Sequence, residues 1–311
     1  MPDYDYKTEF EDYIITHLPK NYSVSSVNTY LDCPKSFLYQ YILHLCPEED
    51  LEDDTPEEDK GSEDYAEWGR IIHYALENYV RDVMKEKHHL GFEVLTKYFD
   101  EKQKELIKDA GATTIANKKE NLQKYFVEEL TKIDPNNFFA VEMKVPDPDT
   151  EGGKKYLPIE GINFKGVVDR VDFVEEIDDV KYYSIYDYKA GADKSKLKGK
   201  VCCKSRNEEK PRNKYFNQLA FYKYVLETEY KMKIKDVGII CPEDPKSSFI
   251  IEELSGEDGL KKCYELVIKR FTKAIKEDIQ QKHIFDCKIG CAKSGEHCYC
   301  NNKDFCKSAV I

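Results

Sequence analysis

Hydrophobic residues in the first part of the chain recur at intervals of three and four, the spacing of amphipathic helices. Serines suited to cap a helix precede the first such run, and Pro34 suits the first turn of the next one. An acidic stretch at 48–64, which contains Pro and Gly, interrupts the pattern and is expected to form a loop. Residues 1–135 are therefore predicted to be mainly helical. The predicted helices cover about 23–31, 34–45, 65–87, 92–109 and 117–133.

The pattern changes to the apolar and polar alternation of β-strands after about residue 136. Predicted strands cover about 137–145, 156–162, 164–174, 181–188, 236–241 and 248–254, and predicted helices cover 213–231 and 257–281. The tail has no regular pattern and is rich in cysteine. We expect one integrated domain of the α/β (α+β) class. It would consist of a helical region at 1–135, a core at 136–283 and a cysteine-rich tail at 284–311.

Two acidic residues face each other if the segment KGVVDRVDFVEEIDDVKYYSIYDYKAG folds as a hairpin. In a hairpin symmetric about Asp178, paired residue numbers add up to 356, a condition that Asp169 and Asp187 satisfy. Lys189 then projects from the same face as Asp187, because side chains alternate along a strand. Adjacent carboxylates repel each other unless a cation or a shared proton relieves the repulsion, and their oxygens suit Mg²⁺ or Mn²⁺. Lys189 could orient an attacking water or stabilise charge on a phosphate. The alternative is an ordinary hairpin whose polar residues face solvent.

The formal net charge of −12 is unevenly distributed. Residues 48–67 contain twelve acids and one base, whereas residues 189–214 contain ten bases and three acids. A basic segment directly after a candidate catalytic strand suits phosphate binding, although it could also be a solvated lysine-rich loop. No run of about 18 apolar residues exists, and the N-terminus lacks the features of a signal peptide. We expect a soluble, cytoplasmic protein without membrane contacts, in which eleven cysteines indicate thiolate chemistry rather than disulfides.

The sequences GVVDRVD and IYDYKAG resemble the metal-binding core of the PD-(D/E)XK nucleases, specifically the RecB-type branch. The resemblance implies a restriction-endonuclease-like core, with a central mixed sheet flanked by helices. It also implies that Asp169 and Asp187 are metal ligands and that Lys189 is the catalytic lysine.

Three further motifs occur in the order typical of this branch. The GxxxH pattern ending at His73 resembles the helix whose histidine completes the metal site. Glu142, in AVEMKV, matches a frequent acidic position, for which we expect a structural or supporting role. Gln218 and Tyr222 match the QxxxY helix, which implies contact with the substrate, although an aromatic core helix would explain Tyr222 equally well.

The cysteines form a second pattern, with Cys33 before a proline near the N-terminus and a cluster in the last 25 residues. This resembles the iron–sulfur subset of the branch, found in AddB-type nucleases and CRISPR adaptation exonucleases, which implies a [4Fe–4S] cluster that holds the tail against the N-terminal region. The third tail ligand could be Cys298, Cys291 or His297, and a zinc site or free thiols are the alternatives to a cluster. The predicted cluster ligands are Cys33, Cys298, Cys300 and Cys306.

These motifs together predict a metal-dependent DNA nuclease that hydrolyses phosphodiester bonds. The resemblance implies an exonuclease on single-stranded DNA that acts in recombination, repair or CRISPR adaptation. The alternative hypothesis is an accessory DNA-binding subunit of a helicase or integrase complex. A small-molecule hydrolase is disfavoured, because the sequence lacks a nucleophile motif such as GxSxG.

Overall fold

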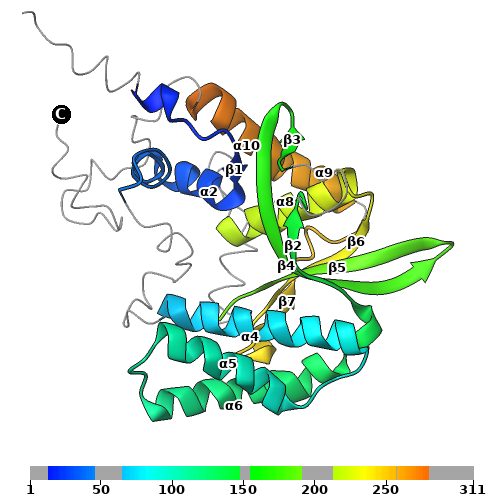
Figure 1. Ribbon diagram of the computed structural model, residues 1–311. Helices are drawn as coiled ribbons and strands as arrows, with labels where there is room; N and C mark the ends of the chain where they lie inside the picture. The colour runs from blue at the N-terminus through cyan, green and yellow to red at the C-terminus, as the bar shows by residue number, and fades with distance from the viewer. Residues whose placement is uncertain (1–12, 46–64, 148–154, 191–212, 257, 280–311) are drawn as a thin grey trace, which may run out of the picture.

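One long strand organises the central sheet (Figure 1). The computed structural model describes residues 13–45, 65–147, 155–190, 213–256 and 258–279, and the sheet has seven strands within these residues. Strand β4 pairs with β1, β2, β3 and β5, while β5 pairs with β6 and β6 with β7. The β1–β4 and β5–β6 pairs are parallel and the others are antiparallel, which confirms the predicted mixed sheet. The strands are β1 (Tyr22–Ser23), β2 (Phe138–Val145), β3 (Leu157–Ile159), β4 (Ile162–Ile177), β5 (Val180–Tyr188), β6 (Lys233–Ile240) and β7 (Phe249–Ile250).

Helices cover both faces of this sheet, with α4, α5 and α6 on one side and α2, α8, α9 and α10 on the other (Figure 1). The first of them is fixed locally, since Ser23 and Ser26 form a reciprocal capping box at the start of α2. None of the described helices is both long enough and apolar enough to cross a membrane. The α-helices are α2 (Val24–Asp32), α3 (Pro34–Phe37), α4 (Tyr65–Glu86), α5 (Phe92–Leu106), α6 (Ala112–Glu128), α8 (Lys214–Thr228), α9 (Asp258–Cys263) and α10 (Lys269–Lys273).

Short 3₁₀ and π segments extend or link these helices. The π segments η1, η7 and η8 continue α3, α9 and α10, so the last helical stretch runs without a break from 258 to 279, close to the prediction. The 3₁₀ segments are η4 (Leu130–Lys132), η5 (Pro135–Asn137) and η6 (Pro245–Ser247), and the π segments are η1 (Leu38–Ile42), η7 (Tyr264–Ile268) and η8 (Ala274–Ile279).

Two predicted strands are shorter in the structure. The strand expected at 156–162 ends at Ile159, because Glu160 and Gly161 both have positive φ and turn the chain directly into β4. The strand expected at 248–254 is limited to two residues, since the chain turns again from 252. Strand β4, in contrast, is longer than the predicted 164–174: it begins at Ile162 and continues to Ile177.

The β4–β5 hairpin has the predicted register in the half that approaches the body of the protein. Pairs from Arg170–Tyr186 to Phe173–Tyr183 have numbers that add up to 356. Towards the tip, a bulge shifts the sum to 357, and the turn at 178–179 has positive φ at both residues (50° and 63°). Two positive φ values are typical of a type I′ hairpin turn, which is centred between the two residues. A turn centred between residues 178 and 179 gives pairs that add up to 357, whereas the sequence prediction assumed a turn centred on Asp178. The extra residue of the bulge shifts the pairing by one, so the pairs beyond it add up to 356 as predicted.

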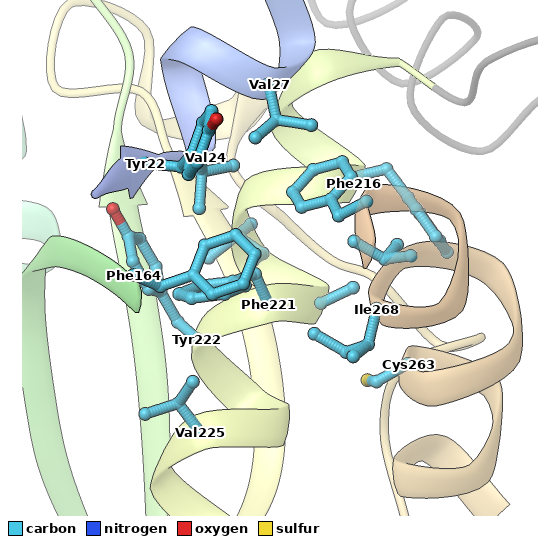
Figure 2. Close-up of a cluster of buried hydrophobic side chains, with 14 of the residues drawn as sticks. Tyr22, Val24, Val27, Phe164, Phe216, Phe221, Tyr222, Val225, Cys263 and Ile268 are labelled. Carbon is cyan, nitrogen blue, oxygen red and sulfur yellow. The ribbon is translucent and has the colours of Figure 1, made fainter. Parts of the chain in front are cut away.

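The sheet separates two hydrophobic cores. One lies between the sheet and α4–α6, and the other is formed with α2, α8 and the C-terminal helices. Figure 2 shows part of the second core, where Phe216, Phe221 and Tyr222 of α8 lie between Phe164 of β4 and the helical stretch that contains Ile268. Val171 and Ile185, from the paired part of the hairpin, are fully buried in this second core.

Candidate active site

Asp169 lies where strands β4 and β5 separate. Their ladder ends at the Arg170–Tyr186 pair, and the Asp169 carboxylate then takes the place of the next backbone acceptor: its Oδ2 accepts a hydrogen bond of 2.8 Å from the backbone N–H of Tyr188. The carboxylate is therefore held at the junction of the two strands.

His73 approaches Asp169 from α4, whose apolar face packs on the sheet. Its Nε2 lies 2.9 Å from the carbonyl oxygen of Tyr188. A carbonyl oxygen only accepts hydrogen bonds, so Nε2 carries the hydrogen, and Nδ1 is the ring nitrogen that can present a lone pair to a metal. That Nδ1 lies 3.6 Å from Oδ2 of Asp169. Histidines that bind metals commonly donate their other N–H to a carbonyl or carboxylate in this way.

Glu142 completes a group of three possible metal ligands. It lies in β2, between the pairs Val141–Arg170 and Met143–Val168, and so stands opposite Asp169 in the β2–β4 ladder. One donor atom each from His73, Glu142 and Asp169 lies within 4.8 Å of the other two. Glu142 also has a φ of 47°, a backbone conformation that non-glycine residues adopt at a cost of about 1–3 kcal/mol and that is often found at functional sites.

This donor set fits a divalent cation. Two carboxylates and an imidazole lone pair converge on one point, and without a cation or a proton their negative ends would repel one another. Carboxylate oxygens with one imidazole nitrogen form a site that hard divalent ions such as Mg²⁺ and Mn²⁺ can occupy. The geometry therefore supports a metal site, although it includes Glu142, for which the sequence predicted only a structural or supporting role.

Asp187 and Lys189 lie next to each other at the end of β5. Asp187 is almost fully buried, and its Oδ2 lies 3.1 Å from Nζ of Lys189. The ammonium group also lies over the ring of Tyr215, 4.6 Å from its centroid, and the Lys189 backbone N–H donates to the carbonyl of Ile240. Aspartate, backbone and aromatic ring together fix the lysine. Asp187 contributes no atom to the group formed by His73, Glu142 and Asp169.

Tyr222 and Gln218, predicted to contact substrate, lie beside these acids on α8. Burial raises the pKa of the Tyr222 phenol well above its usual range, and the charges of Asp169 and Asp187 act in the same direction. Hydrogen bonds from the Val167 N–H and with Gln218 partly oppose that shift. Since one phenol senses both acids, Asp169 and Asp187 share its surroundings. The phenol itself is buried among protein groups.

The predicted cluster ligands are only partly described. Cys33 is buried at the junction of α2 and α3, where its backbone N–H donates to Thr29 and its carbonyl accepts from Phe37. Cys291, Cys298, Cys300, Cys306 and His297 lie outside the described residues, as do the acidic stretch at 48–64 and most of the basic segment, 191–212.

The sequence did not indicate the part played by Arg170 and Tyr188. Tyr188 holds both Asp169 and His73 through its backbone, and its phenol accepts a hydrogen bond of 3.0 Å from Nη1 of Arg170. The available signal was the arginine between the two aspartates of the DRVD segment.

The chain belongs to the PD-(D/E)XK nuclease superfamily, because the sequence model of that superfamily matches residues 21–307, nearly the whole chain. Its members are nucleases that use divalent metals, which agrees with the donor group at His73, Glu142 and Asp169 and with the mixed sheet flanked by helices. The fold is thus the predicted restriction-endonuclease-like one. A comparison with curated protein sequences found no significant match.

Proposed function

We propose that the protein is a metal-dependent deoxyribonuclease that hydrolyses phosphodiester bonds, with its active site at the end of β5. The observation that carries the proposal is the convergence of donor atoms from His73, Glu142 and Asp169 within 4.8 Å, beside a lysine held by a buried aspartate. Metal ligands and an oriented ammonium group can each offset the negative charge that develops when a phosphodiester is hydrolysed.

His73, Asp169 and Asp187 are the proposed metal ligands, and Glu142 joins them on the strength of its position. A bound Mg²⁺ or Mn²⁺ would supply positive charge that offsets charge on the scissile phosphate and makes a water more acidic. The protein's own side chains orient the water and offset the charge that develops on the phosphate. Asp187 orients Lys189, and the Lys189 ammonium donates hydrogen bonds to the attacking water or to a phosphate oxygen as negative charge develops there. The water's oxygen joins phosphorus, a backbone phosphorus–oxygen bond breaks, and the departing oxygen takes up a proton.

The resemblance to the RecB-type branch supports the finer part of the proposal. We propose single-stranded DNA as the substrate, attack from an end, and a role in recombination, repair or CRISPR adaptation, in which a helicase or integrase would be the partner. The basic residues at 189–214 would bind the phosphate backbone. We also propose a [4Fe–4S] cluster held by Cys33, Cys298, Cys300 and Cys306.

The decisive experiment measures cleavage of end-labelled single-stranded DNA with Mn²⁺ and with Mg²⁺. Lys189→Ala and Asp187→Ala should each reduce the rate by about 10²–10³-fold, because the first removes the ammonium group at the phosphate and the second removes the carboxylate that orients it. Since the two side chains act as a unit, the double variant should be little worse than either single one.

Lys235→Ala is the matched control, since it removes an equal charge from an ion pair with Glu175 on the far part of the hairpin. It should cleave at the wild-type rate. Undiminished cleavage by Lys189→Ala would end the proposal. DNA binding by the wild-type protein without any metal-dependent cleavage would instead support the accessory-subunit alternative.

A further inference from the structure

The two metal-facing residues His73 and Asp169 share a single support. The backbone N–H of Tyr188 donates to Oδ2 of Asp169 at 2.8 Å, and the carbonyl of the same residue accepts from Nε2 of His73 at 2.9 Å. The ring of His73 also meets the ring of Tyr188 edge to face, with centroids 5.7 Å apart. A displacement of Tyr188 would therefore move or release both residues together.

The side chain of Tyr188 is fixed by Arg170 in the core between the sheet and α4–α6. The phenol is buried and accepts a hydrogen bond of 3.0 Å from Nη1 of Arg170, which also donates to the phenol of Tyr125 on α6 at 3.1 Å. Arg170 directly follows Asp169 in β4. Asp169 binds the backbone of Tyr188, and Arg170 binds its phenol.

The guanidinium group of Arg170 is itself held on every side. Its Nε and Nη2 donate to Oδ2 of Asp172 at 3.1 and 2.8 Å, and the rings of Phe138, Tyr186 and Tyr188 lie around it. Burial alone would lower the pKa of Arg170, but Asp172 and the two phenols hold it well above its usual value. The guanidinium group is thus charged, buried and held in one orientation, so it fixes the position of the Tyr188 phenol.

We infer that Arg170 and Tyr188 are positioning residues: on the side of the sheet that α4–α6 cover, they hold His73 and Asp169 in the arrangement that binds the divalent metal. The inference rests on the proposed function. It goes further by assigning a role in metal affinity to two residues that touch neither metal nor substrate. Asp172 belongs to the same unit, because it neutralises and orients the arginine.

Tyr188→Phe tests this role, because it removes one hydroxyl group and leaves the ring and both backbone hydrogen bonds in place. Tyr125→Phe is the matched control. It removes the other hydroxyl that binds the same Nη1 atom, but its residue lies on α6 and makes no backbone contact with either metal-facing residue among the described contacts.

The measurement is Mn²⁺ binding to the DNA-free protein, followed by the electron paramagnetic resonance signal of free Mn²⁺, together with thermal unfolding. Both variants should lose similar thermal stability. Tyr188→Phe should bind Mn²⁺ about three- to tenfold more weakly, less than the 10- to 100-fold typical of groups that contact a ligand directly, whereas Tyr125→Phe should stay within about twofold of wild type. Raising Mn²⁺ to saturation should restore cleavage by Tyr188→Phe.

Equal Mn²⁺ affinity in Tyr188→Phe and wild type would overturn the inference alone, because the network would then serve only stability. Wild-type protein that binds Mn²⁺ no better than His73→Gln would overturn the proposed metal site and the inference together. The two failures are therefore distinguishable.

Discussion

His73 and His89 show how one contact separates a candidate ligand from a structural histidine. Both donate from Nε2 to a backbone carbonyl, His73 to Tyr188 at 2.9 Å and His89 to Ile133 at 2.7 Å. They differ at Nδ1, which faces a carboxylate in His73 but is buried without a hydrogen-bond partner among the described residues in His89. Only His73 therefore presents its lone pair to a place where a cation would be stabilised.

Substitution of these two histidines by glutamine should have different consequences for metal binding. Glutamine can keep the hydrogen bond to the carbonyl but has no nitrogen lone pair at the position of Nδ1. We expect His73→Gln to weaken Mn²⁺ binding by about tenfold or more, and His89→Gln to leave it unchanged. Isothermal titration with Mn²⁺ measures both. A similar loss in the two variants would show that the effect comes from local destabilisation.

The spacing of the motifs predicted His73, Asp169, Asp187 and Lys189 as one set. In the structure, His73 and Asp169 share a donor group with Glu142, while Asp187 and Lys189 pair with each other at the end of β5, and Tyr222 senses the charges of both aspartates. Glu142 was placed in the right strand, but its contact with the site depends on pairing with β4 and on a φ of 47°. Neither is visible in the sequence, where the alternation of AVEMKV alone cannot show which face meets a histidine on a distant helix.

At the scale of elements, the close approach of α8 to β4 depends on Gly166. A Cβ atom at that position would lie 2.7 Å from Cε1 of Tyr222, closer than real Cβ contacts allow. The phenol of Tyr222 meets the backbone N–H of Val167, and Gln218 hydrogen-bonds to it from the same helix. The glycine thus sets the distance between α8 and the strand that carries Asp169.

Two glycine-to-alanine substitutions should change stability in opposite directions. Gly166→Ala should destabilise the protein by about 1–3 kcal/mol, because the Tyr222 ring must move, and should slow DNA cleavage. Gly69→Ala should stabilise it by about 0.5–1 kcal/mol, because this residue lies within α4 and a Cβ there has no described atom within 4 Å. Urea unfolding of the two variants gives both values. A stability loss in Gly69→Ala would indicate that the glycine is required by contacts beyond the described residues.

The elements themselves were largely predictable, because helical and alternating patterns are strong over long segments. What the sequence could not show was the pairing that depends on local backbone irregularities. The hairpin register came out as expected near Arg170 only because a bulge offsets a turn at 178–179. The short strands β3 and β7 were overestimated because apolar residues continue past the turns that end them.

At the scale of the whole molecule, the candidate site lies between the two helical layers that cover the faces of the sheet. Tyr188, which supports His73 and Asp169, is buried in the core under α4–α6, whereas Val171 and Ile185 are buried in the core on the other face. His73 comes from one layer and Tyr222 from the other. The candidate site and the residues around it therefore draw on the helices of both faces of the sheet. A match to the nuclease superfamily over residues 21–307 is consistent with a site assembled from most of the chain.

Cys33 and Cys263 allow a test of whether the two ends of the chain are joined through a metal cluster. Both are buried, but they lie in different surroundings: Cys33 at the junction of α2 and α3, and Cys263 in the core beside α8, where burial raises the pKa of its thiol to about 12. A thiol with so high a pKa is a poor metal ligand, because ligation requires the thiolate.

Cys33→Ala should therefore lower the iron content of anaerobically purified protein from about four atoms per chain, as expected of a [4Fe–4S] cluster, to near zero, whereas Cys263→Ala should retain it. The melting temperature should fall further in Cys33→Ala, because loss of the cluster would release a crosslink between distant parts of the chain. Inductively coupled plasma mass spectrometry and thermal unfolding provide the two measurements.

If the protein contained zinc and no iron, the site would be a zinc site and not an iron–sulfur cluster. If the metal content of Cys33→Ala were unchanged, Cys33 would not be a ligand. Either result would leave the test of Lys189 and Asp187 as it stands, since those residues lie at the end of β5 and Cys33 between α2 and α3.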